Sequence, residues 1–113
     1  MRRAPLWLLA IVACAVLAAD AWGVTTRTIK IGDNYFVRDG SAPTVTVKRD
    51  TRVTWRWAGN SPHNVTVRTG PVRFHSTTKT TGTYVKRLTR RGTYKIYCSI
   101  HGAADQSMTL VVK

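Results

Sequence analysis

From Trp22 onward, short runs in which apolar or β-branched residues alternate with polar ones are separated by turn-forming residues. Successive side chains of a strand point to opposite faces, so this period of two predicts strands with one buried face. The runs cover residues 26–31, 44–57 (two strands), 63–68, 72–74, 83–88, 93–98 and 107–113. Seven or eight short strands and no helical segment predict an all-β, antiparallel Greek-key sandwich.

The segment 52–57 shows which face of such a strand is buried. Val53, Trp55 and Trp57 lie on one face, and Thr54 and Arg56 lie on the other. We therefore expect the valine and the two tryptophans to point into the core.

The N-terminus has the layout of a secretory signal, with Arg2 and Arg3 ahead of an apolar run over 4–19. This run is shorter than the roughly 20 residues that a helix needs to cross a bilayer. We expect residues 1–21 to be removed on export, leaving one domain over residues 22–113 in a periplasmic or extracellular compartment. An uncleaved anchor and a lipid attached at Cys14 are the alternatives.

The charge is strongly positive, since 18 Lys and Arg face five acidic residues, all of them Asp. Without residues 1–21, 16 basic and four acidic residues remain, a formal charge of +12. No nucleic-acid-binding motif accompanies this charge. The charge instead predicts an acidic protein partner or an anionic envelope surface, or it serves solubility alone. With so few carboxylates and no nucleophile signature, the chain is not expected to be an enzyme. A monomer without a membrane span after export is the expected state.

Cys98 is the one cysteine of residues 22–113, so the exported chain can form no internal disulfide. Such a cysteine can be a metal ligand, a reactive thiol, an intermolecular bridge or a buried packing residue. It shares its face of the strand with Tyr94 and Ile96, and His101 follows three positions later on a loop. His63, at the start of an earlier strand, is a further candidate ligand, whereas His75, beside a polar loop, is expected to be exposed and not to bind metal.

Three stretches, "PHNVTV", "TVTVKRDTRVTWRW" and "GTYKIYCSIH", resemble the cupredoxins, the family of small blue copper proteins. The resemblance extends over residues 26–113. It implies one type 1 copper ion with His63, Cys98 and His101 as equatorial ligands, and an Asn64 side chain that braces the histidine loop against the cysteine loop. A thiolate with two imidazoles and a weak fourth ligand suits copper in both oxidation states, whereas structural zinc sites more often use paired cysteines.

The weak axial ligand is the point at which the sequence departs from the usual family pattern of a methionine after the second histidine. Gln106 and Met108 both follow His101. Counting inward positions of the last strand from Gln106 gives Met108, Leu110 and Val112, all apolar. We therefore expect Gln106 to be axial through its side-chain oxygen, with Met108 as the alternative.

The resemblance implies an exported carrier of single electrons that cycles between Cu(I) and Cu(II). The edge of the His101 ring would be the port for electrons, within a small or apolar patch that comprises Pro62, Ile100, His101, Gly102, Ala103 and Ala104. A protein that stores or delivers copper in the cell envelope would use the same ligands without redox turnover. An interaction sandwich in which Cys98 only packs is the third class.

Overall fold

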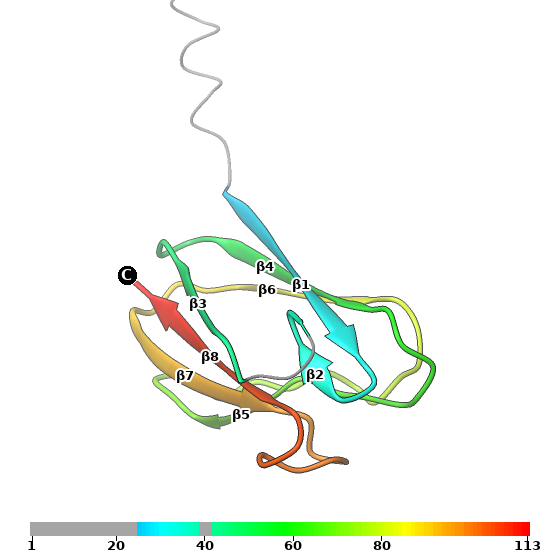
Figure 1. Cartoon of the computed structure of the whole chain (residues 1–113). Coiled ribbons are helices and arrows are strands. Elements are labelled where there is room, and N and C mark those ends of the chain that lie inside the picture. Colours follow the sequence, from blue (N-terminus) through cyan, green and yellow to red (C-terminus); the bar gives the residue numbers. More distant parts are fainter. Residues whose placement is uncertain (1–24, 39–41) are drawn as a thin grey trace, which may run out of the picture.

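The computed structural model describes residues 25–38 and 42–113, which form eight strands (Figure 1). The strands are β1 (Thr26–Gly32), β2 (Tyr35–Phe36), β3 (Thr44–Val47), β4 (Arg52–Trp57), β5 (Thr66–Thr69), β6 (Thr83–Arg87), β7 (Gly92–Tyr97) and β8 (Ser107–Val112). Within these residues, no helix could span a membrane. The predictions of a signal at residues 1–21 and of Cys14 as a lipid site fall outside the described residues.

The strands form two four-stranded sheets, with the orders β2-β1-β4-β6 and β3-β8-β7-β5. The sheets face one another (Figure 1), and their inner faces carry one cluster of buried apolar residues. The prediction of an all-β sandwich is confirmed. Such a two-layer arrangement buries the apolar face of each sheet against the other.

Two strand pairs differ from the expected antiparallel arrangement, because β1 is parallel to β4 and β3 is parallel to β8. The chain leaves the first sheet after β2, forms β3 in the second sheet, and returns as β4 beside β1. Strands joined by such crossovers can run in the same direction, whereas a tight hairpin makes its strands antiparallel. Both sheets are therefore mixed.

The burial of β4 follows the alternation of its sequence. Val53, Trp55 and Trp57 are buried, whereas Arg56 is exposed and Thr54 is partly covered. The prediction of the inward face is confirmed. Trp55 lies at the centre of an aromatic group, with ring centroids 6.1 Å from Phe74 and 5.9 Å from Tyr84.

Two of the predicted runs are shorter or absent as strands. β5 begins only at Thr66, and residues 63–65 before it have the single bridge from His63 to Lys79. Residues 72–74 form no strand, although Phe74 is buried. An apolar residue at the edge of a sandwich can pack on the core without strand pairing, so the alternation alone overestimates strand length.

Three segments meet at the end of the sandwich opposite the C-terminus. They are the turn between β1 and β2, the segment 58–65 that follows β4, and the loop 98–106 that joins β7 to β8. Side-chain hydrogen bonds connect all three, as described below. The candidate site lies where they meet.

Candidate metal centre

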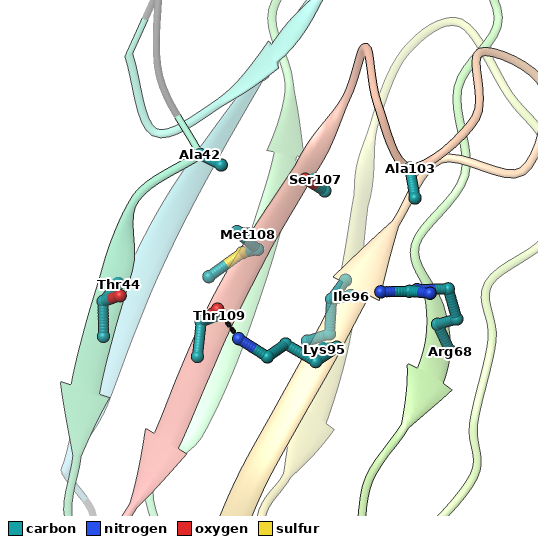
Figure 2. Close-up of a pocket in the computed structure, with 9 residues that line it drawn as sticks. All are labelled: Ala42, Thr44, Arg68, Lys95, Ile96, Ala103, Ser107, Met108 and Thr109. Atoms are coloured by element: carbon teal, nitrogen blue, oxygen red, sulfur yellow. Dashed lines mark hydrogen bonds between the residues drawn. The ribbon is translucent and has the colours of Figure 1, made fainter.

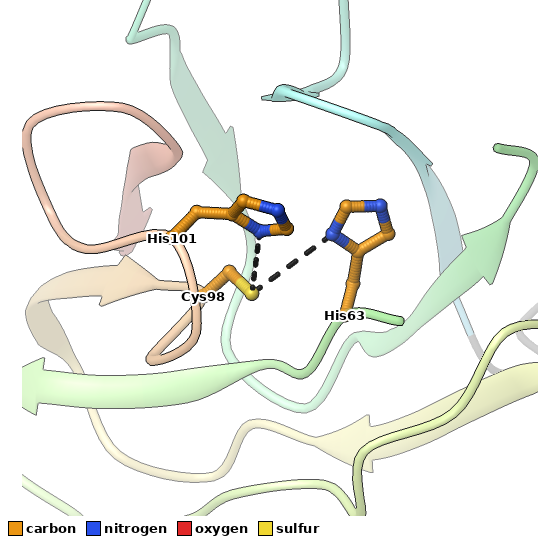
Figure 3. Close-up of side chains that lie close together, drawn as sticks. All are labelled: His63, Cys98 and His101. Carbon is orange, nitrogen blue, oxygen red and sulfur yellow. Dashed lines mark hydrogen bonds between the residues drawn. The ribbon is translucent and has the colours of Figure 1, made fainter. Parts of the chain in front are cut away.

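His63, Cys98 and His101 come together at this end, with their ligand atoms all within 4.8 Å of one another (Figure 3). Cys98 Sγ lies 3.9 Å from His63 Nδ1 and 3.5 Å from His101 Nδ1. With bonds of about 2.0 Å to nitrogen and about 2.3 Å to sulfur, two such ligands of one trigonal metal ion lie roughly 3.8 Å apart. The observed distances fit a shared ion.

Cys98 follows the last residue of β7 and is completely buried, on the same face as Tyr94 and Ile96. Its backbone N–H donates to the carbonyl of Gln106 across the loop, at 3.1 Å. Its carbonyl accepts from the N–H of Gly102, which has a φ of 86°. A glycine adopts this left-handed conformation without strain, so the chain can turn back and bring His101 to the thiol.

His63 is also completely buried, and its two ring nitrogens have different surroundings. Nδ1 faces Cys98, whereas Nε2 lies 3.2 Å from Asp33 Oδ1. The backbone of His63 is held by three further hydrogen bonds. Its carbonyl accepts from Trp57 Nε1 at 3.1 Å and from the N–H of Lys79, and its N–H donates to the carbonyl of Lys79. These hydrogen bonds hold the imidazole in place from both its ring and its backbone.

Asp33 is a site residue that the sequence analysis missed. Its Oδ1 accepts from the backbone N–H groups of Asn60 and Ser61 at 2.7 and 2.9 Å, in addition to its contact with His63. These bonds, above all those from Ser61 and His63, hold the pKa of the Asp33 carboxyl below its usual value. In the sequence Asp33 stands in a "GDN" turn, and its partners follow 27 to 30 residues later, so no local pattern identifies it.

Asn64 connects the histidine segment to the cysteine loop. Its Oδ1 accepts from the backbone N–H of Ser99 at 3.0 Å, and its Nδ2 donates to Ser99 Oγ at 2.8 Å. The side chains of Thr66 and Thr78 supply further partners. The Asn64 side chain therefore links the segment that carries His63 to the loop that follows Cys98.

Gln106 is 1% exposed, and its two amide atoms differ in their contacts. Nε2 donates to the carbonyls of Gly32 and Tyr35 at 2.9 and 3.1 Å, whereas Oε1 is buried without a hydrogen-bond partner among the described residues. A buried carbonyl oxygen without a partner is costly unless something else coordinates it. This oxygen is therefore available to a metal ion.

Met108 lies two residues further along β8, opposite Ile96 in the strand register. It is buried and lines a surface pocket (Figure 2) together with the cations Arg68 and Lys95. Gln106, by contrast, pairs through its carbonyl with Cys98 itself. In the backbone register, Gln106 is thus closer to the cluster than Met108 is.

The remaining predicted positions lie at the surface of this end. His101 is partly buried, and Ile100, with 52% of its surface exposed, is one of two exposed large apolar residues in the described chain. Gly102 and Ala103 are partly exposed, and Pro62 and Ala104 are exposed. His75 is exposed, as predicted, and does not belong to the cluster.

The donor set limits the chemistry of this end. One thiolate and two imidazoles in a trigonal arrangement, with a weak oxygen or thioether donor on the axis, are typical of blue copper sites. The Oε1 atom of Gln106 is a neutral oxygen donor of this chemical type. The residues present therefore fit a single copper ion.

Comparisons with known proteins agree with the fold and the donor set. Residues 28–113 match the family model described as copper binding proteins of the plastocyanin/azurin family. No curated protein sequence matches the chain closely enough to count as a relative.

Among solved structures, an oxidised variant of amicyanin is 26% identical, with a TM-score of 0.63, over 82% of this chain and 85% of that one. A purple cupredoxin from Nitrosopumilus maritimus is 20% identical, with a TM-score of 0.63, over 77% of this chain and 99% of that one. A copper-containing nitrite reductase from Thermus scotoductus, 19% identical with a TM-score of 0.63, matches 78% of this chain but 22% of its own. The last two show a shared fold alone.

Proposed function

Since the chain belongs to the plastocyanin/azurin family of copper-binding proteins, we propose that it is an exported type 1 copper protein that carries single electrons between redox partners. The observation that carries the proposal is the cluster of His63, Cys98 and His101. Bound copper would supply a one-electron couple between Cu(I) and Cu(II). We propose that the chain is not an enzyme by itself, because its five carboxylates and its lack of a nucleophile signature give acid–base or nucleophilic catalysis little to work with.

The proposed ligands are His63 and His101 through Nδ1, Cys98 through Sγ and, on the axis, Gln106 through Oε1. Figure 3 draws the first three converging on one point. The fourth is supported by the Oε1 atom of Gln106, which is buried and has no hydrogen-bond partner in the part of the chain that the structure describes. Because β4, β7 and their hydrogen-bonded loops already hold these side chains, a change of oxidation state would require little rearrangement of the chain.

The proposed port for electrons is the ring of His101, since His63 and Cys98 are completely buried. Ile100 would give a partner an apolar contact beside this ring. Residues Pro62, Gly102, Ala103 and Ala104, which are small or apolar, would complete the patch.

A partner with an acidic docking surface is proposed from the charge of about +12 on residues 22–113. Charges of opposite sign steer two proteins together, and salt screens them over roughly 10 Å at 0.1 M. We expect electron transfer to such a partner to slow as ionic strength rises. A rate independent of salt would assign the basic surface to solubility.

Addition of Cu(II) to the purified protein, followed by visible absorption and voltammetry, tests the proposal. An intense thiolate-to-copper band with reversible one-electron reduction is the expected result. Copper binding without that band or without reversible reduction would favour storage or delivery in the cell envelope. No binding would leave an interaction sandwich in which Cys98 only packs.

A further inference from the structure

We propose that Asp33 is a positioning residue of the metal centre: its carboxylate selects the tautomer of His63 and orients the ring so that Nδ1 is free to bind metal. The proposal rests on the proposed copper site for its consequence. The geometry on which it stands, however, involves only atoms of the chain itself. The contact that carries it is the 3.2 Å distance between Asp33 Oδ1 and His63 Nε2.

The tautomer follows from the chemistry of the two groups. An ionised carboxylate can only accept hydrogen bonds, so the proton of a neutral His63 ring lies on Nε2. Nδ1 then keeps its lone pair, and it is Nδ1 that faces Cys98 Sγ at 3.9 Å. A carboxylate bonded to the far nitrogen of a ligating histidine fixes the ring and makes it a stronger donor.

The contact is built into the fold and is more than a feature of the local turn. Asp33 Oδ1 also accepts from Asn60 and Ser61, so that the turn between β1 and β2 holds the segment leading to His63. The backbone of Gly59 approaches so closely that a Cβ atom there would lie 2.1 Å from Asp33 Oδ1. A side chain at position 59 would therefore displace the Asp33 carboxylate, which shows that the segment packs directly on it.

The negative charge has a second consequence, because Asp33 is one of three acidic residues in the described part of a strongly basic chain. Coulomb attraction grows with the charge of the cation, so a carboxylate next to a ligand stabilises Cu(II) more than Cu(I). We therefore expect Asp33 to lower the reduction potential. A tenfold change in the ratio of the two affinities corresponds to about 59 mV.

Three variants separate position from charge. Asp33→Ala removes the acceptor, and Asp33→Asn keeps an acceptor oxygen without the charge. Asp50→Asn is the matched control: it removes the same charge from the turn between β3 and β4, at the opposite end of the sandwich, where φ is 73° and asparagine is well tolerated. The readouts are the ¹⁵N chemical shifts of the His63 ring in the metal-free protein, the affinity for Cu(II) and the reduction potential.

With Asp33→Ala, we expect the metal-free His63 ring to populate both tautomers and Cu(II) affinity to fall 10- to 100-fold, the range for loss of such a partner. With Asp33→Asn, the tautomer should persist while the potential rises by about 59 mV or more. This second variant also serves if Asp33→Ala does not fold.

Unchanged ring shifts and unchanged Cu(II) affinity in Asp33→Ala would overturn the positioning role. A potential in Asp33→Asn no higher than in Asp50→Asn would overturn the role of the charge. Failure of the unmodified protein to bind Cu(II) would instead refute the proposed function. In that case the ring shifts of the metal-free variants still decide whether Asp33 positions His63.

Discussion

The body of the sandwich and the end that carries the cluster are stabilised by different interactions. In the body, apolar side chains at alternate positions, such as Val53 and Trp55, pack between the sheets. At the cluster end, polar side chains bond to distant backbone groups: Gln106 donates to the carbonyl of Gly32, 74 residues away in the chain. The core can therefore tolerate a change of ligand, and the ligand side chains are held by hydrogen bonds of the cluster end itself.

The largest expected effect is the loss of the metal centre at the cluster end, with the body of the sandwich still folded. Cys98→Ser should abolish the visible copper band, because a hydroxyl is not a soft anionic ligand like a thiolate. The metal-free fold should persist, since serine has nearly the same size as cysteine. Visible absorption after addition of Cu(II) measures the metal centre, and circular dichroism of the metal-free protein measures the fold.

The exposed His75 supplies the control for this experiment, and His75→Ala should keep the full band. A full band in Cys98→Ser would show that the ligand set is wrong. Loss of the band in His75→Ala would require that set to be redrawn.

The second prediction concerns a substitution that destabilises the body of the sandwich. Trp55 is fully buried and contacts Phe74 and Tyr84, so Trp55→Ala should lower the free energy of unfolding by about 3–5 kcal/mol. Protein that remains folded should keep the copper band at its usual wavelength, because the ligands are held by their own hydrogen bonds. Chemical denaturation and absorption of the same samples measure the two effects.

The exposed Val85 is the matched control on the neighbouring strand β6, and Val85→Ala should change stability by no more than about 0.5 kcal/mol. If Trp55→Ala shifted the band as strongly as it lowered stability, the two regions would not be separable.

The same contrast explains what the sequence could predict. The inward faces of β4 and β7 follow from a period of two, which acts within a few residues. The approach of Cys98 and His101 was also predictable. His101 follows the end of the strand at Cys98 by only three positions, and Gly102 directly after it lets the chain turn. Asp33 and the parallel pairing of β1 with β4 depend on segments far apart in the chain, which leave no local pattern.

The boundaries near the site were also less predictable than the core. Alternation in residues 63–68 predicts a strand, yet the strand begins at Thr66. The bonds of Asn64 to Ser99, and of His63 to Asp33, hold this segment in place of a regular strand ladder. Side chains that serve the site thus replace the regular structure that their sequence favours.

The third prediction concerns Gln106, the proposed axial ligand at the cluster end. Gln106→Met should raise the reduction potential, because a thioether is a softer donor than an amide oxygen and favours Cu(I). We expect a rise of at least about 59 mV, which corresponds to a tenfold change in relative affinity. The change also removes the donors to Gly32 and Tyr35, so unfolding of the metal-free protein, which we expect to become easier by about 1–3 kcal/mol, is measured separately.

The smallest effect is expected two residues away, where the cluster end gives way to the body. Met108 is 2% exposed and lies opposite Ile96, whereas the carbonyl of Gln106 is bonded to Cys98. Met108→Leu keeps the volume and the apolar character of the side chain, so it should cost less than about 1.5 kcal/mol. It should leave the electron paramagnetic resonance spectrum and the potential nearly unchanged. A strong spectral shift in Met108→Leu, together with none in Gln106→Ala, would make Met108 the axial ligand. The cluster end would then extend two residues further into β8.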